Sequence, residues 1–175
     1  MIVSFNGMTP KIAPTAFIHP LAYVCGDVTI EEHVTVLPFA SIRGEFAPIV
    51  IGAYSNVQDN VSVHTDPGQP MRIGQHVAIG HNAVFHGLRC GDNTLIGMGA
   101  VVVQHCEVGE WCLVAGGAVL AEGMQVPDRS LVLGVPAKFR PLNDTQLARL
   151  ERSGRNYVRL GEQYLAGASS LDLEG

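Results

Sequence analysis

The chain has 175 residues, of which 47% are hydrophobic and 15% charged, and its formal net charge at pH 7 is −5. This balance leaves no basic stripe for a phosphate backbone, so we expect no nucleic-acid binding. No stretch reaches the length of about eighteen apolar residues that a membrane span needs, and the first residues lack the features of a signal peptide. We therefore expect a protein that neither crosses a membrane nor is secreted.

Aliphatic residues recur every six positions along most of the chain. A short strand over Met1–Phe5 is expected to lead into this series. A buried helix face would need a period near 3.6 residues and an alternating strand a period of 2, so neither explains the pattern. The members are Ile12, Ile18, Val24, Ile30, Val36, Ile42, Ile51, Val57, Val63, Ile73, Ile79, Phe85, Cys90, Ile96, Val102, Val108, Val114, Leu120, Val126 and Val132.

A six-residue repeat over roughly 120 residues is typical of a parallel β-helix, in which short strands form the flat faces of a prism. With three faces, one coil takes eighteen residues. The spacing slips to nine, ten and five residues before Ile51, Ile73 and Cys90, and elsewhere the position four places after a member is usually small or β-branched. We therefore predict an all-β solenoid over residues 1–142.

Histidines in the middle of the repeat form a candidate metal site. His64 and His86 are 22 residues apart, which is one coil plus the four-residue excess before Ile73, so they occupy equivalent positions on successive coils. Stacked strands lie about 4.8 Å apart, close enough for two imidazoles to share one metal ion. By the same count, Arg43 belongs to this column one coil earlier.

A third histidine, His81, belongs to the preceding face, with Asp59 beneath it and Gln58 beside Asp59. A side chain around a corner cannot easily close a site within its own chain, but it can reach a neighbouring subunit. We therefore predict a homotrimer with a site at each interface, which closed cyclic symmetry makes self-consistent. Three neutral imidazoles and a fourth position for water are the ligand set of a catalytic zinc, and Fe²⁺ or Co²⁺ would also fit.

The remaining histidines have no partners in their columns, so we interpret them as edge residues of the prism. The four cysteines show no C-x-x-C spacing, and three of them occupy inward positions where a thiol behaves as a small hydrophobe. Free thiols favour a reducing cytoplasm. The edge histidines are His19, His33, His76 and His105, and the inward cysteines are Cys90, Cys106 and Cys112.

After Val132 the repeat ends and the period becomes helical. The sequence Asn143 to Gln146 resembles an N-cap with a polar partner three residues later. We predict a C-terminal unit over residues 143–166, an amphipathic helix bent at Gly154 whose apolar stripe covers a side of the prism. Residues 167–175 are predicted to be disordered.

Four segments of the chain resemble the gamma-class carbonic anhydrase family. They are IRGEFAPIVIGAYSNVQDNVSVHTD (residues 42–66), IGHNAVFHG (79–87), CGDNTLIGMGAVV (90–102) and LGVPAKFRPL (133–142). The resemblance implies a left-handed coil and the reversible hydration of CO₂ to bicarbonate, for which zinc lowers the pKa of water to about 7. On matching positions it implies zinc ligands at His64, His81 and His86, a water-orienting amide at Gln58, and an ion pair between subunits from Arg43 and Asp59.

Two features depart from that family. Where the family reads Arg-Gly-Asp, this chain reads Arg43-Gly44-Glu45, and the extra methylene leads us to expect a rearranged or lost contact to Arg43. The loop TDPGQPMR lacks the glutamate that exports the proton in the best-studied branch. Tyr157 of the predicted helix is expected to line the pocket, so the candidate catalytic residues are Glu45, Gln58 and Tyr157.

Two other functions remain open on the same scaffold. Hexapeptide acyltransferases use one histidine as a base between subunits, so three converging histidines count against that reading, whereas a metal-dependent thioesterase would keep all three. A non-catalytic trimer, serving as an assembly subunit or retaining its metal without activity, is the other alternative. The substituted Glu45 and the short loop favour this last possibility.

Overall fold

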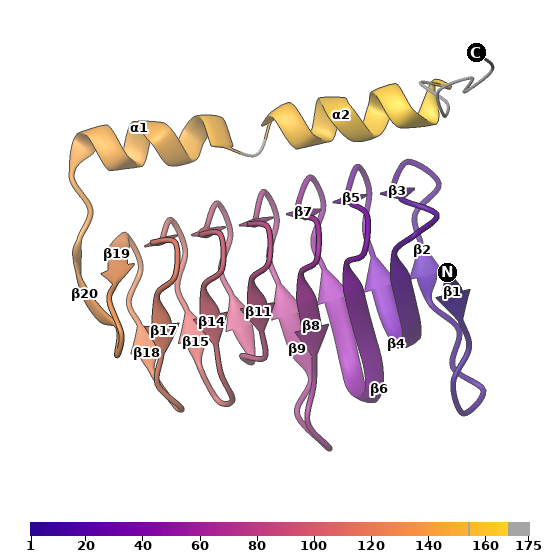
Figure 1. Cartoon of the computed structure of the whole chain (residues 1–175), viewed down its shortest axis with the longest axis horizontal. Coiled ribbons are helices and arrows are strands. Elements are labelled where there is room, and N and C mark those ends of the chain that lie inside the picture. The colour runs from indigo at the N-terminus through magenta and orange to yellow at the C-terminus, as the bar shows by residue number, and fades with distance from the viewer. Residues whose placement is uncertain (154, 168–175) are drawn as a thin grey trace, which may run out of the picture.

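The computed structural model describes residues 1–153 and 155–167, which form a left-handed parallel β-helix followed by two helices (Figure 1). One face of the prism is an 8-stranded sheet, and the other two faces are joined into a 12-stranded sheet by β4 and β6, which run around a corner. The 12-stranded sheet contains β1 (Ile2–Val3), β2 (Lys11–Ile12), β4 (Tyr23–Ile30), β6 (Ser41–Ile51), β8 (Ser62–His64), β9 (Met71–Ile73), β11 (Val84–Phe85), β12 (Arg89–Cys90), β14 (Val101–Val102), β15 (Glu107–Val108), β17 (Val119–Leu120) and β18 (Gln125–Val126). The 8-stranded sheet contains β3 (Phe17–Ile18), β5 (Thr35–Val36), β7 (Asn56–Val57), β10 (Ala78–Ile79), β13 (Leu95–Ile96), β16 (Leu113–Val114), β19 (Ser130–Leu133) and β20 (Lys138–Pro141).

The strand register confirms the predicted repeat. In the 8-stranded sheet the stacked positions are Val57, Ile79, Ile96, Val114 and Val132, which are 22, 17, 18 and 18 residues apart. Coils depart from eighteen residues only where the sequence spacing slips. The first strand is shorter than expected, since β1 covers only two residues and pairs with β4.

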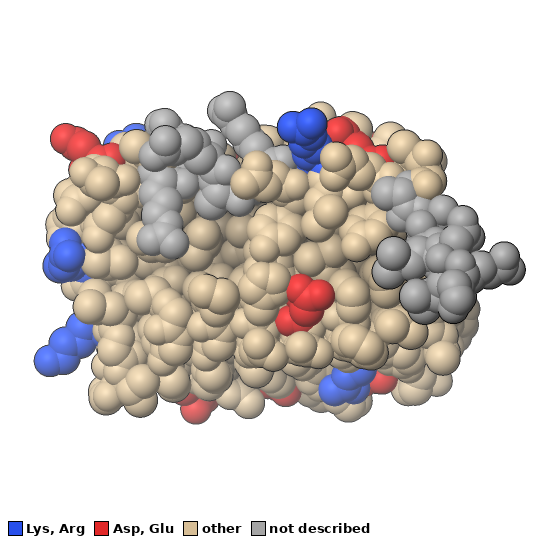
Figure 2. Space-filling model, turned by 45° about the horizontal axis from the view of Figure 1, so that its top comes forward, with Lys and Arg blue, Asp and Glu red and all other residues tan. Residues whose placement is uncertain are grey.

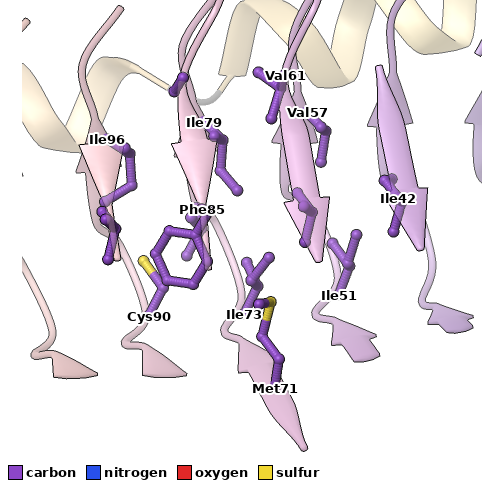
Figure 3. Close-up of a cluster of buried hydrophobic side chains, with 14 of the residues drawn as sticks. Ile42, Ile51, Val57, Val61, Met71, Ile73, Ile79, Phe85, Cys90 and Ile96 are labelled. Atoms are coloured by element: carbon purple, nitrogen blue, oxygen red, sulfur yellow. The ribbon is translucent and has the colours of Figure 1, made fainter. Parts of the chain in front are cut away.

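Side chains of the six-residue series fill the inside of the prism (Figure 3). Val63, Phe85, Val102 and Leu120 lie above one another on one face and are fully buried. Each is covered by the coils on both sides, so burial of aliphatic surface holds the stack together. No coil could bury its own apolar residues alone.

Truncation of one of these side chains should cost much of the stability. We expect Ile96→Ala to lower the free energy of unfolding by about 2–5 kcal/mol, because the stacked coils cannot collapse into the cavity. Leu21→Ala, at an exposed side chain, should change it by no more than about 0.5 kcal/mol. Urea denaturation at one protein concentration measures both, and equal losses would contradict a core held by the inward series.

The corners of the prism carry residues in the left-handed backbone region, including Tyr54 at φ 60°. Tyr54 stacks between His33 and His76, with ring centroids 4.9 and 5.1 Å apart. The prediction that these two histidines have no column partner is therefore wrong. The prediction failed because it compared the positions of histidines only with those of other histidines, whereas the stacking partner of both His33 and His76 is a tyrosine.

All four cysteines are free and buried. Burial raises the pKa of the Cys90, Cys106 and Cys112 thiols, which keeps them in the unreactive protonated form. We expect a thiol reagent at pH 8 to label the native protein about tenfold more slowly, or slower still, than the urea-unfolded chain, which should titrate as four thiols. Rapid native labelling of Cys90 or Cys112, located by peptide mass spectrometry, would show that the coils open.

Two helices, α1 (Asp144–Ser153) and α2 (Arg155–Leu165), run back over the outer face of the 8-stranded sheet (Figure 1). The predicted reciprocal cap is present, because Gln146 N donates to Asn143 Oδ1 at 2.9 Å and Asn143 N donates to Gln146 Oε1 at 3.0 Å. The expected bend at Gly154 falls outside the described residues, as does the expected disordered tail apart from Gly167. Neither helix has the length and apolar character to span a bilayer.

The helices pack on their own prism. Leu150 of α1 lies against Leu113 and Leu131, and Tyr164 of α2 stacks on Phe17 with centroids 4.6 Å apart. Thr35 Oγ1 donates to the carbonyl oxygen of Tyr157 at 2.8 Å. These contacts fix Tyr157 above the sheet face that carries the sequence-predicted His81.

Candidate metal centre

His64 and His86 form a stacked pair, as the count of residues predicts. Val63 and Phe85 are register partners in β8 and β11, so the residues that follow them lie one above the other. The ring centroids are 5.2 Å apart and the rings are inclined at 77°. Both Nε2 atoms are buried, and neither has a hydrogen-bond partner among the described residues. Two buried, unpaired nitrogens that face the same space are expensive unless a cation or a donor occupies it.

A carboxylate lies beside each of these nitrogens. Glu45 Oε2 is 3.6 Å from His64 Nε2, and Asp66 Oδ1 is 3.3 Å from His86 Nε2. Glu45 also makes a close ion pair with Arg43, which is the register partner of His64. Of the two expected outcomes, a rearranged or a lost contact to Arg43, the structure therefore excludes the loss. The extra residues of β6 near its corner give Glu45 room to turn back.

The environment of His64 favours its neutral form. Burial of the imidazole, and then the positive charge of Arg43 beside it, hold the pKa of His64 below its ordinary value of 6.5. A neutral imidazole keeps the lone pair that a metal needs. At neutral pH, protons therefore compete little for this nitrogen.

This shift can be measured in metal-free protein by NMR titration. We expect His64 to titrate below pH 6.5, and Arg43→Gln to move its pKa upward because a repelling charge is removed and Glu45 loses its cation. A downward movement, or a wild-type value above 6.5, would show that burial and Arg43 do not control this group.

His81 is held on the adjacent face by two other residues. Its Nδ1 lies 2.7 Å from Asp59 Oδ2, and its Nε2 lies 3.3 Å from the hydroxyl of Tyr157. A proton on Nδ1 satisfies the carboxylate and leaves the lone pair on Nε2, the usual second-sphere arrangement of a metal-binding histidine. Burial and the charge of Asp59 raise the pKa of Tyr157, so its hydroxyl stays protonated and can donate to Nε2.

Gln58 is buried and hydrogen-bonded both within its own coil and to the next coil. Its Oε1 accepts from the backbone N–H of His81 at 3.2 Å, and its Nε2 donates to Asn56 Oδ1 at 2.9 Å. One N–H of Gln58 remains for a ligand. With His81 and Tyr157, Gln58 lines a cavity of about 490 Å³ whose other walls are mainly aliphatic, including Leu95.

The predicted site residues thus fall into two groups. Arg43, Glu45, His64 and His86 converge at one corner, and Gln58, Asp59, His81 and Tyr157 at another. Within residues 1–153 and 155–167, no three or more histidine, cysteine, aspartate or glutamate side chains converge in the geometry of a metal site. Sequence reasoning missed Asp66, although it lies two residues after His64 in the loop that was inspected only for glutamate.

The residues present fit a divalent metal. His64 and His86 offer a pair of buried Nε2 atoms without donors and with carboxylates beside them, and the contact of His81 Nδ1 with Asp59 leaves the lone pair of that ring on Nε2. Imidazole and carboxylate groups suit zinc, iron or cobalt. The fold defines a hexapeptide-repeat protein, and this corner is its candidate metal-binding site.

Comparisons with known proteins agree with this class. A family model described as bacterial transferase hexapeptide (six repeats) matches residues 88–122. The chain is 38% identical to a carbonic anhydrase from Geobacillus kaustophilus, over 95% of this chain and 92% of that protein. The chain belongs to the gamma-class carbonic anhydrase family of hexapeptide-repeat proteins.

Other proteins similar to this chain have names that do not refer to carbonic anhydrase. The chain is 34% identical to the carnitine operon protein CaiE of Escherichia coli (strain K12), over 82% of this chain and 74% of that protein. It superposes with a TM-score of 0.91 on a putative acetyltransferase of Bacillus cereus, at 32% identity, covering 95% and 97% of the two chains.

Proposed function

We propose that this protein catalyses the reversible hydration of CO₂ to bicarbonate at a divalent metal that is shared between subunits of a homotrimer. The observation that carries the proposal is the pair of stacked imidazoles, His64 and His86, whose buried Nε2 atoms have no donor. His81 lies on another face, where Asp59 orients its ring and where it cannot reach the pair within its own chain. Zn²⁺ is the first choice of metal, and Fe²⁺ or Co²⁺ fits the same groups.

We infer that the metal site is shared between subunits because His81 lies apart from the His64–His86 pair within one chain. A partner related by a threefold axis can bring its His81 to the His64–His86 pair of the first chain, and every subunit then gives and receives one half. On the face seen in Figure 2, Lys and Arg lie toward the edges, and an acidic group lies near the middle of an area that otherwise carries no charged side chains. Arg43 and Asp59 would form an ion pair across the same contact.

The chain's own residues have distinct roles in this proposal. Asp59 accepts from Nδ1 of His81 and so orients its Nε2. Gln58 is held by Asn56 and by the backbone of residue 81, and its remaining N–H orients the reacting water. Arg43 balances the charge of Glu45, which faces His64. The metal supplies Lewis-acid activation of water at neutral pH.

A second candidate is hydrolysis of a thioester at the same metal, or acyl transfer. The observation in its favour is the cavity of about 490 Å³ beside His81 and Tyr157, which is far larger than CO₂ needs and has aliphatic walls. A trimer without activity is the third candidate function.

We place the protein in the cytoplasm, where its four free thiols would stay reduced.

Metal content and CO₂ turnover test the main proposal together. We expect Zn²⁺- or anaerobically Fe²⁺-loaded protein to hydrate CO₂ in stopped flow. His64→Ala and His81→Ala should both lose metal and at least about a hundredfold in kcat/KM, because each removes one ligand. His76→Ala, at a corner ring without any role here, should keep both. Metal binding with no CO₂ hydration would refute the reaction, and acyl-CoA hydrolysis would then be assayed.

Mixed trimers test whether the site is shared. When the two inactive variants are unfolded together and refolded, a chain with intact His64 and His86 can meet a neighbour with intact His81. Random assembly should restore about a quarter of the sites. No recovery in trimers shown to be mixed by capture on an affinity tag carried by one variant only, or full metal content in His81→Ala alone, would show that one chain holds the metal by itself.

A further inference from the structure

Asp66 lies at the metal corner but has no part in the function proposed above. Its Oδ1 is 3.3 Å from the buried His86 Nε2, yet the two atoms are not in hydrogen-bond geometry. Two neighbouring donors around one tetrahedral ion with bonds of about 2.0–2.1 Å are separated by roughly 3.3 Å. The separation of these two atoms is therefore compatible with two groups that face one cation.

The charge of Asp66 is not balanced in the way that of Glu45 is. Glu45 has the guanidinium of Arg43, whereas the one ion pair that Asp66 makes among the described residues is the contact to His86. A partly buried carboxylate without a guanidinium or ammonium partner is stabilised when another positive charge lies beside it.

The loop that carries Asp66 is held at both its base and its tip. At the base, the buried hydroxyl of Thr65 donates to the carbonyl oxygen of Ala47 at 3.1 Å. The tip is a turn in which Gln69 N donates to Asp66 O at 3.1 Å, with Pro67 and Gly68 (φ 73°) at the central positions that a type II turn requires. The turn directs the Asp66 side chain toward His86.

A chain of side-chain contacts fastens the tip of the loop to the coils above. Gln69 Nε2 lies 2.7 Å from His105 Nε2, and His105 Nδ1 lies 3.0 Å from Glu122 Oε1. If Glu122 accepts from Nδ1–H, then Nε2 of His105 accepts from the Gln69 amide. His105 was expected to be an edge residue without a partner, but it connects three segments of the chain. It is a positioning residue for the loop, and through the loop for Asp66.

We propose that Asp66 supplies a carboxylate to the metal centre and that His105 positions it there. The inference rests on the proposed metal site, to which it adds a protein group that lies in the same chain as His64 and His86. Over residues 1–153 and 155–167 the groups of one chain do not converge in the geometry of a metal site, so in this proposal the ion is held only once a neighbour contributes His81. A carboxylate beside imidazoles suits Fe²⁺ as well as zinc.

Co²⁺ binding to the intact trimer tests the proposal without an activity assay. We expect Asp66→Asn, which keeps the shape and removes the charge, to weaken Co²⁺ binding by about 10- to 100-fold in competition with a chelator. The visible absorption of the Co²⁺-loaded protein should change as well. Glu32→Gln removes one charge at an exposed corner and should bind within about twofold of the wild type.

His105→Ala provides a second, milder variant at an exposed position. Releasing the loop should weaken Co²⁺ binding less than Asp66→Asn does, and it should add nothing in the Asp66→Asn background, since both act through one carboxylate. His19→Ala, another histidine outside the site, is its matched control. Equal weakening by His105→Ala in both backgrounds would overturn the positioning role.

His64→Ala separates failure of this inference from failure of the proposed function. If Asp66→Asn binds Co²⁺ like the wild type while His64→Ala does not, Asp66 is outside the centre and the three-histidine site stands. If His64→Ala also binds Co²⁺ normally, the metal is not held at this corner, and both proposals fall. Should Asp66→Asn not fold, as judged by circular dichroism, Gln69→Ala at the loop tip takes its place with the outcome expected for His105→Ala.

Discussion

The parallel register between successive coils is the constraint on which this protein depends. Stacked strands are held about 4.8 Å apart by backbone hydrogen bonds, and buried aliphatic side chains keep every coil in the same phase. The number of residues between two positions in the sequence therefore determines how far apart they lie along the prism. His64 lies above Arg43, and His86 above His64, because Ile42, Val63 and Phe85 must be stacked inside the prism.

The interruptions of the six-residue repeat place carboxylates beside the stacked histidines. The core cannot absorb additional residues without losing its phase, so they leave the prism as the long corner of β6 and as the loop between β8 and β9. The first brings Glu45 back to Arg43, and the second brings Asp66 to His86. A perfectly regular solenoid would have placed the two imidazoles in a column but would have given them no carboxylates.

The other half of the centre depends on contacts between distant parts of the chain. His81 lies on the face covered by the C-terminal helices, where Asp59 one coil below holds one ring nitrogen and Tyr157 of α2 faces the other. Because faces of the prism meet at corners, this imidazole points away from the first pair. The same geometry that stacks His64 and His86 prevents His81 from joining them in one chain, and the threefold assembly proposed above would bring the three imidazoles together.

The sequence by itself determined the parts governed by periodicity: the solenoid, the coil lengths, the His64–His86 column and the reciprocal cap at Asn143. These follow from spacing because a β-helix maps sequence onto space with a fixed step. Only the tertiary structure decided where side chains on loops and helices lie. The contact of Asp66 with His86 and the tether through His105 depend on loop conformation and side-chain direction, about which a residue count carries no information. Tyr54 does follow the coil count to His33 and His76, but the count does not show that side chains of different types stack on one another.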